Sequence, residues 1–308
     1  MRKWLLVLAL IIIAAIISVY FVIPSTINIT QITPVRCTAA GAYRNMATPD
    51  KWAIWSLNRI NKPLRYHYDT YRVTKKTLLN TVEVYVMHRD ITAISTINLL
   101  PLPGDSSVIE WKCSFPSGNN PFMRIQRYLQ AIDIKNNMAG MLARFQTFVE
   151  KPENVYGIAI HVEYAKDSLL IATKTVLPSY PVTADIYKLV NTLKKYSTAQ
   201  QAQQTGIPMF NVTPLDKGGF QLMAALPVNK LLNDNGPFFK RQIPLNKFLV
   251  THAKGGEATV QHALTQLQLY IQDHHRVAMA IPFLQLTTDR TEQPDTTKWV
   301  TSIYIPVF

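Results

Sequence analysis

The feature that most constrains this chain is a repeat in its C-terminal half. Residues 299–308 alternate in polarity and end in Ile-Pro-Val, and residues 222–228 end in a closely similar Leu-Pro-Val. Two further pairs of similar stretches follow the same order, residues 207–211 with 281–285 and residues 169–173 with 248–252. The spacing is nearly constant, at roughly 75–80 residues, which is typical of a duplicated unit. Each copy is predicted to run strand, helix, strand, strand.

Length and charge limit the classes of protein that this chain can belong to. Its 308 residues predict two domains and a further segment. Apolar residues make up 48% of the chain, which is enough for real cores. The net charge is +13, but Lys and Arg occur in ones and twos without an Arg-rich run. We therefore expect no nucleic-acid partner.

Residues 4–23 form an uncharged apolar stretch at the N-terminus. Arg2 and Lys3 precede it, and the next basic residue is Arg36. A stretch of ~20 apolar residues with basic residues before it predicts a single-pass membrane helix whose N-terminus is cytoplasmic. The domains would then lie outside the cytoplasm, which is the periplasm if the source is Gram-negative. The alternative is a cleaved signal peptide, although no Ala-x-Ala site precedes Ser25.

We predict three segments: an anchor at residues 1–24, a first domain at 25–152 and a second at 153–308. In the first domain, strands are expected at residues 27–32, 66–73, 80–88, 92–99 and 108–115, and short helices at 38–46 and from Pro49. Asn120 and Pro121 then begin a long helix. Its predicted apolar stripe comprises Phe122, Ile125, Leu129, Ile132, Leu142, Phe145 and Val149, widened by Ile134, Met138 and Met141.

The first domain resembles the polyketide cyclase/dehydrase branch of the START-like (SRPBCC) superfamily. The resemblance is carried by the strand at residues 27–32 and by the Lys-Trp-x-x-Trp segment at residues 51–55. It implies a helix-grip fold with a hydrophobic cavity between the sheet and the long helix, holding a lipid-like or polycyclic ligand. Trp52 and Trp55 are candidate ligand-binding residues on this basis. The alternative is that both are ordinary core aromatics.

The duplicated domain resembles the GyrI-like domain, also called the AraC-type effector-binding domain. The two strand-helix-strand-strand copies and the ending Thr-Ser-Ile-Tyr-Ile-Pro carry the resemblance. It implies a groove for drug-like, often cationic molecules, with a central Glu where this chain has Ser302. The departure predicts a groove that prefers neutral, flat apolar ligands. Candidate ligand-binding residues, from the alternation of side chains along strands, are Ser302, Tyr304, Phe283 and Gln285.

Catalytic motifs are scarce. His274 and His275 are adjacent but lack partners at metal-ligand spacing, so we predict no metal, no cofactor and no catalytic residue. Cys37 and Cys113 could form one disulfide or remain two buried thiols. The fold class is predicted to be α+β. The predicted function is non-catalytic binding of a small hydrophobic ligand by a membrane-anchored bacterial sensor or carrier. The alternative is an enzyme, either a cyclase-like lyase or a GyrI-like hydrolase.

Overall fold

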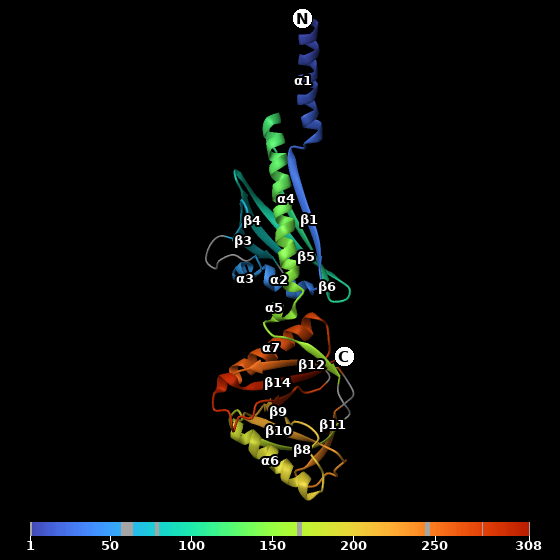
Figure 1. The fold of residues 1–308 in the computed structure, drawn as a ribbon, viewed down its shortest axis with the longest axis vertical. Coiled ribbons are helices and arrows are strands. Elements are labelled where there is room, and N and C mark those ends of the chain that lie inside the picture. The colour runs from blue at the N-terminus through green and yellow to red at the C-terminus, as the bar shows by residue number, and fades with distance from the viewer. Residues whose placement is uncertain are drawn as a thin grey trace. The chain divides into compact units, whose positions relative to one another are not determined.

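The chain folds into two compact units. Figure 1 colours the ribbon by residue number, so that the elements of each unit can be followed in order. Unit 1 comprises Met1–Val155 and unit 2 comprises Tyr156–Phe308. The computed structural model describes residues 2–56, 64–77, 80–164, 168–243, 247–278 and 280–307. Each unit combines helices with one antiparallel sheet, so the predicted α+β class is confirmed.

Unit 1 has the predicted order of elements, with one strand, two short helices, a meander of strands and a long helix. Its elements are α1 (Arg2–Val22), β1 (Thr26–Val35), α2 (Ala39–Met46), α3 (Pro49–Trp55), β2 (Leu64–Tyr66), β3 (Asp69–Thr77), β4 (Thr81–His88), β5 (Ile91–Leu102), β6 (Ser106–Pro116), α4 (Pro121–Val149) and α5 (Pro152–Tyr156). The sheet order is β1-β6-β5-β4-β3-β2, so the first strand pairs with the last one before the long helix. α4 packs along β1.

The helix starts are set by local chemistry. Thr38 and Asn120 each accept a hydrogen bond from a backbone N–H in the first turn of the helix that follows, at 3.2 Å from Gly41 and 2.9 Å from Phe122. Such side chains satisfy donors that a helix leaves unpaired at its start. Pro121 occupies the first turn of α4, where its missing N–H costs nothing. The predicted start of the long helix is therefore confirmed.

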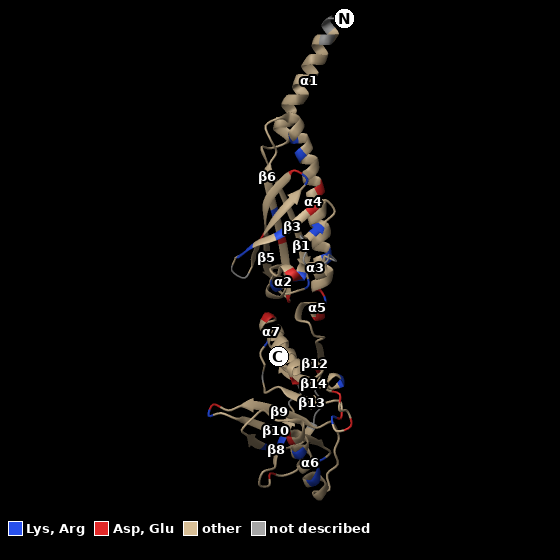
Figure 2. Cartoon of the chain, turned by 90° about the vertical axis from the view of Figure 1, so that its left-hand side faces the viewer, with Lys and Arg blue, Asp and Glu red and all other residues tan. Residues whose placement is uncertain are grey.

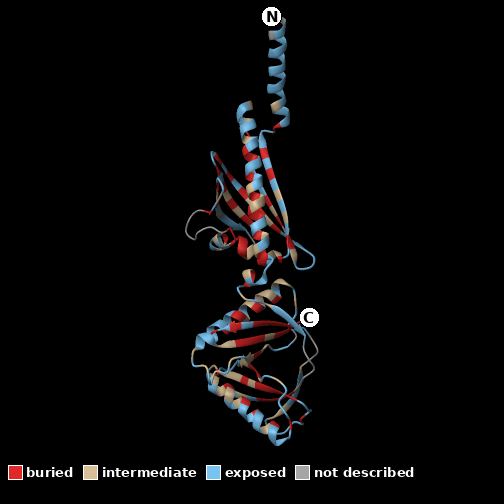
Figure 3. Ribbon diagram, in the orientation of Figure 1, coloured by how far each residue is buried: buried red, intermediate tan, exposed pale blue. Residues whose placement is uncertain are grey.

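The predicted apolar stripe of α4 is wrong in its first half (Figure 3). Phe122 is 77% exposed, and Ile125, Leu129 and Ile132 are also exposed. The buried side of the helix is formed by Gln130, Ala131, Ile134, Met138, Met141, Leu142, Phe145 and Val149. The helix packs on the core of unit 1 only from Gln130 onward. Spacing of apolar residues alone did not distinguish these two halves, because both satisfy the same periodicity.

The N-terminal helix α1 is held to α4 at its end. The hydroxyl of Tyr20 donates to the carbonyl of Asn119 at 2.7 Å, and the Arg124 guanidinium lies 4.4 Å from the centre of the Tyr20 ring. Among the described residues, no helix combines the length and apolar character that crossing a bilayer requires. This finding contradicts the prediction of a single-pass anchor with both domains outside the cytoplasm.

Unit 2 contains the duplicated element order on one sheet. Its strands and helices are β7 (His161–Tyr164), β8 (Ser168–Leu177), α6 (Thr183–Ala199), β9 (Met209–Pro214), β10 (Phe220–Val228), β11 (Phe239–Ile243), β12 (Lys247–Lys254), α7 (Glu257–Asp273), β13 (Phe283–Leu286), η1 (Thr296–Lys298) and β14 (Val300–Val307). The sheet order is β11-β8-β10-β9-β13-β14-β12-β7. The two copies, β8-α6-β9-β10 and β12-α7-β13-β14, meet where β9 pairs with β13. The predicted copies of strand, helix, strand, strand are therefore present.

The structure corrects one alignment within the repeat. Phe248 pairs with Pro306 in one copy, and the residue paired with Pro227 in the other copy is Leu170 rather than Leu169. The predicted match of residues 169–173 with 248–252 is thus one residue out of register. Because side chains alternate between the two faces of a strand, this slip assigns every side chain to the wrong face.

The edge strands of unit 2 are exchanged between the copies. β7 precedes the first copy in sequence but pairs with β12 of the second copy. β11 precedes the second copy but pairs with β8 of the first copy. Each repeat is therefore a five-element unit whose first strand completes the sheet of its neighbour. The sequence analysis missed both of these short strands.

The two helices of unit 2 pack on the same set of strand residues, and so on the same side of its sheet. Alternate residues of the long strands, such as Leu222 and Ile303, join the buried residues of both helices in a single core cluster. The opposite side of the sheet carries a small, separate cluster of Leu170, Ala172, Met209 and Ala225. We call this side the strand face. Among the described residues, neither α6 nor α7 contributes to the cluster on this side.

Cys37 and Cys113 are two buried thiols rather than a disulfide. Burial, with a smaller contribution from the Asp69 carboxylate, raises the pKa of the Cys113 thiol to about 12 from 9.0. The folded chain therefore holds this proton more tightly than the unfolded chain does. The protonated Cys113 thiol therefore adds to the free energy of unfolding. This contribution is fully present below pH ~9 and is lost as the pH rises toward ~12.

We expect the free energy of unfolding to fall by up to about 1 kcal/mol per pH unit between pH 9 and 11 because of this thiol. The Cys113→Ala variant should lack that part of the pH dependence. Urea unfolding at several pH values compares the two slopes. Parallel slopes for the wild type and the variant would show that Cys113 titrates as it does in water.

Candidate functional site

The four residues predicted in the duplicated domain come together on the strand face. Ser302 pairs with Gln285, and Tyr304 pairs with Phe283, across β13 and β14. Their neighbour Ile303 points to the core under the helices. Because alternate residues share a face, Ser302, Tyr304, Phe283 and Gln285 lie on the side away from the helices. Whether they contact a ligand remains a prediction.

Ser302 lies inside a short chain of polar side chains. Its Oγ is 2.8 Å from His252 Nδ1 and 2.7 Å from Thr287 Oγ1, and the residue is 3% exposed. The hydroxyl is thus already engaged by protein partners. A carboxylate at this position would have to be buried beside the same two groups. The serine supplies no charge to the strand face.

Tyr304 and Phe283 form the aromatic wall that the sequence predicts. Their rings are stacked, with centroids 4.8 Å apart and planes 7° from parallel. Phe248 meets both rings edge-on, at 5.6 Å from Phe283 and 6.3 Å from Tyr304. Offset stacks and edge contacts of this kind fix ring positions before any ligand arrives. Burial raises the pKa of Tyr304 above its ordinary value, so its hydroxyl stays neutral at physiological pH.

A pocket of about 220 Å³ lies beside this wall, and we call it the strand-face pocket. Of the four predicted residues, only Phe283 lines it. Its walls are Leu170, Ala172, Met209, Phe210, Asn211, Met223, Ala225, Arg241, Gln242, Ala280, Ile281, Pro282 and Phe283. Arg241 is the one charged residue in this described lining, and its guanidinium lies 4.6 Å from the centre of the Phe239 ring. The lining offers apolar contact and no negative charge.

Trp52 and Trp55 lie in unit 1, within its core. Both are almost fully buried, and their ring centroids are 4.9 Å apart. Trp52 also meets Trp111 edge-on, and Trp55 meets Phe145 edge-on. The Trp52 ring N–H donates to the carbonyl of Met46 in a buried hydrogen bond. These contacts fill the space around both rings, as expected of core aromatics. Ligand binding by either residue remains a prediction.

Unit 1 contains a buried polar group that the sequence analysis missed. Asp69 and His88 face each other across β3 and β4, and the His88 Nδ1 contacts Asp69 Oδ1. The Tyr71 hydroxyl donates to Asp69 Oδ2 at 2.6 Å. Burial, with the Asp69 carboxylate, raises the pKa of Tyr71 well above its ordinary range. The signal available in the sequence was the pair of neighbouring strand segments, because antiparallel pairing of β3 with β4 places Asp69 opposite His88.

The Asp69–His88 pair has the form of the carboxylate and imidazole that orient each other in many active sites. Both side chains, however, have no exposed surface. The second ring nitrogen of His88 is buried without a hydrogen-bond partner among the described residues. A substrate would need an opening in unit 1 to reach it. In the described structure this buried group therefore contributes to the stability of unit 1.

Lys and Arg positions are scattered along the ribbon of both units in Figure 2, with acidic positions between them. Several pairs are close, such as Lys112 with Glu110 at 2.8 Å and Arg127 with Asp90 at 2.9 Å. Within the described ranges, no group of three or more His, Cys, Asp or Glu side chains is arranged to hold a metal ion.

Comparison with known proteins gives likenesses of fold only. No protein-family model matches the sequence, and no curated protein matches it. A solved EcmrR–DNA complex shares 15% identity over 60% of this chain and 71% of that chain, with a TM-score of 0.44. SAV2435 bound to tetraphenylphosphonium shares 17% over 49% of this chain and 94% of that one, with a TM-score of 0.31. A hydrolase from Listeria innocua shares 10% over 48% and 91%, with a TM-score of 0.37. At these identities and TM-scores, the likenesses assign no activity to this chain.

Proposed function

We propose that unit 2 is a non-catalytic binding domain of the GyrI-like type that takes a small, neutral, apolar molecule in the strand-face pocket. The observation that carries the proposal is the lining of that pocket, which is mainly aliphatic, thioether and aromatic. Burying apolar ligand surface against such a lining contributes about 25 cal/mol per Å². We further propose that residues 25–152 and 153–308 are separate domains, of which the second carries this site.

The size of the pocket limits the ligand. At about 220 Å³ it is smaller than the ~300–1,000 Å³ of pockets for drug-sized molecules. A molecule of one or two fused rings, or a short acyl chain, fits this volume. Phe283, whose ring is stacked on that of Tyr304, lines the pocket and favours a flat ligand.

Charge in the lining argues against a cation. A cationic ligand gains most when it faces a carboxylate or the open face of an aromatic ring. Here the charged residue is Arg241, which repels a cation, and Ser302 takes the place where the resemblance implies a Glu. The paired faces of Tyr304 and Phe283 are turned toward each other. The proposed ligand is therefore neutral.

The test is a titration of the full chain with 6-propionyl-2-dimethylaminonaphthalene, a neutral probe with two fused rings, followed by its fluorescence. We expect saturable binding with one strong site. Met223→Trp fills the pocket from β10 and should weaken this binding at least about tenfold, because the excluded apolar contact is worth more than ~1.4 kcal/mol.

The matched control is Gln221→Trp, which adds the same ring on the same strand and on the same face, two residues outside the pocket lining. It should leave the affinity unchanged. If both tryptophan variants bind the probe as the wild type does, the probe binds elsewhere and the proposed site is wrong.

A further inference from the structure

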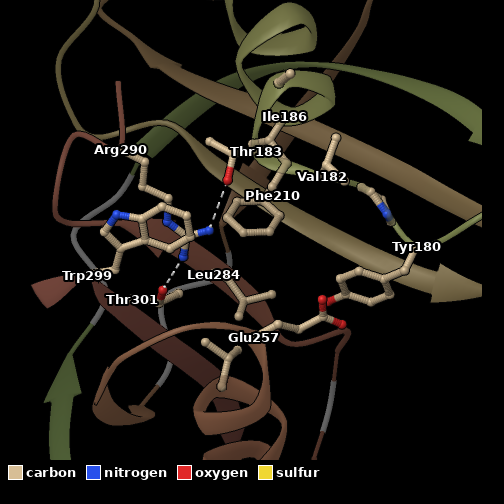
Figure 4. Close-up of a pocket in the computed structure, with 13 residues that line it drawn as sticks. Tyr180, Val182, Thr183, Ile186, Phe210, Glu257, Leu284, Arg290, Trp299 and Thr301 are labelled. Atoms are coloured by element: carbon tan, nitrogen blue, oxygen red, sulfur yellow. Dashed lines mark hydrogen bonds between the residues drawn. The ribbon is translucent and has the colours of Figure 1, made fainter. Parts of the chain in front are cut away.

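A second, larger pocket lies on the helix side of the sheet in unit 2 (Figure 4). Its volume is about 480 Å³, and we call it the helix-start pocket because the first turns of α6 and α7 border it. Its lining residues are Tyr180, Pro181, Val182, Thr183, Ala184, Ile186, Phe210, Glu257, Val260, Leu284, Arg290, Trp299 and Thr301. This volume is in the range of pockets that hold small-molecule ligands. Its lining shares one residue, Phe210, with that of the strand-face pocket.

Arg290 is the chemical centre of the helix-start pocket. Its Nη2 donates to Thr301 Oγ1 at 2.7 Å, and its Nη1 lies 3.5 Å from Thr183 Oγ1 (Figure 4). The guanidinium lies over the Trp299 ring, 4.4 Å from its centre. Its Nε is buried and has no hydrogen-bond partner among the described residues. No described carboxylate forms an ion pair with it.

An arginine in this state is poised to receive an anion. Burial lowers the pKa of Arg290, yet a guanidinium stays charged at neutral pH. A half-buried charge without a counter-ion carries a cost of desolvation that an incoming carboxylate offsets. The Nε–H of Arg290 and the N–H of a neighbouring Nη point in parallel. Together these two donors match the spacing of the two oxygens of a carboxylate.

The loop that carries Arg290 is fixed in advance of binding. Tyr187 of α6 contacts Asp289 Oδ1 at 3.1 Å and accepts the backbone N–H of Arg290 at 3.1 Å. The Trp299 ring N–H donates to the carbonyl of Gln293 at 2.7 Å. A ligand therefore meets an ordered guanidinium and an ordered indole, so little ordering entropy opposes binding.

The helix-start pocket is built where the two repeats differ. The link between β13 and β14 runs over residues 287–299, whereas the equivalent link between β9 and β10 covers only 215–219. The link between β8 and α6, residues 178–182, is likewise longer than residues 255–256 of the other copy. The longer links supply Arg290, Trp299 and Tyr180 to the pocket. Added loops on a repeated scaffold are typical places for a binding site.

We propose that the helix-start pocket binds a flat, largely apolar monocarboxylate, with its carboxylate on Arg290 and its apolar body between Trp299, Phe210 and Leu284. Glu257 lies on the other side of the pocket, near Tyr180, where it opposes a second negative charge (Figure 4). A phosphate dianion is therefore a poorer fit than a carboxylate.

The experiment is calorimetric titration of the full chain with 2-naphthoate and with 2-naphthylmethanol, its neutral analogue. We expect the naphthoate to bind at least about tenfold more tightly, as a charge-assisted bidentate contact requires. Arg290→Met, which keeps the length of the side chain, should remove this preference and leave the affinity for the alcohol within about twofold. Equal affinity of the wild type for the two probes, or no binding of either, would refute the proposal.

Two further variants make the result specific. Arg72→Met is the same substitution at an exposed arginine of unit 1 and should preserve the preference. Val182→Trp narrows the mouth of the pocket from a residue that is 61% exposed, so it tests the site even where Arg290→Met fails to fold. It should weaken the binding of naphthoate at least about tenfold, whereas the neutral alcohol retains the strand-face pocket as a second site. If naphthoate binds the Val182→Trp variant as tightly as the wild type, the anion binds outside the helix-start pocket and the proposal is wrong. This conclusion does not depend on the result of the Met223→Trp titration.

Discussion

Replacing Phe145 with alanine is expected to destabilise unit 1 by about 3–5 kcal/mol. The ring is fully buried in the second half of α4 and meets Trp55 edge-on, with centroids 5.1 Å apart and planes at 72°. Its removal deletes buried apolar surface and leaves a cavity in a rigid core. Urea unfolding followed by tryptophan fluorescence measures the loss, because Trp52, Trp55 and Trp111 all lie in this core.

The control is the same substitution at the other end of the same helix. Phe122 is 77% exposed, so Phe122→Ala should change the free energy of unfolding by no more than about 0.5 kcal/mol. Both variants make the same change in intrinsic helix propensity, so their difference isolates burial. Equal losses in the two variants would mean that the first half of α4 is packed as the sequence predicts.

Replacing Asp69 with alanine should also destabilise unit 1 by about 3–5 kcal/mol, the cost of removing one partner of a buried, hydrogen-bonded pair. Asp69 is the common partner of His88 and of the Tyr71 hydroxyl, and all three are buried. Without it, an imidazole nitrogen and a phenol remain in the core with no acceptor. Chemical denaturation of the two forms gives the difference directly.

Asp133→Ala serves as the comparison, since Asp133 pairs with Arg89 at 3.8 Å with both side chains about half exposed. Exposed ion pairs of this kind contribute less than about 1 kcal/mol. A loss at Asp69 no larger than at Asp133 would show that water reaches the Asp69–His88 pair in the folded chain. Unit 1 would then have an opening to this pair, and a catalytic role for it would become testable.

Much of the fold follows from local signals in the sequence. The starts of the helices at Pro49 and Pro121 depend on residues close to each start, and these signals survive in any tertiary context. The duplicated order was visible because equivalent strands keep their endings, Pro227 and Pro306 among them. The shared face of Ser302 and Tyr304, and that of Phe283 and Gln285, followed from the alternation of side chains along each strand.

The errors arise where a decision depends on distant parts of the chain. The apolar residues of both halves of α4 have helical spacing, but only one half has a core to pack on. The one-residue slip at Leu170 could not be seen, because apolar runs of similar length align equally well in either register. Neither Arg290 nor the Asp69–His88 pair carries a motif. The role proposed for each of them depends on residues that lie far away in the sequence and that the fold brings beside it.

The exchanged strands β7 and β11 have a consequence for the origin and the integrity of unit 2. A chain with one repeat alone would offer its first strand to a partner and lack the strand that its own sheet needs. Two such chains would complete each other as an intertwined homodimer with a twofold axis between β9 and its counterpart. Fusing two copies of such a gene would convert that dimer into one polypeptide, in which each repeat can change its sequence independently. In a homodimer every insertion occurs in both copies. In a fused chain a loop can lengthen in one repeat only, as the links around Arg290 have done.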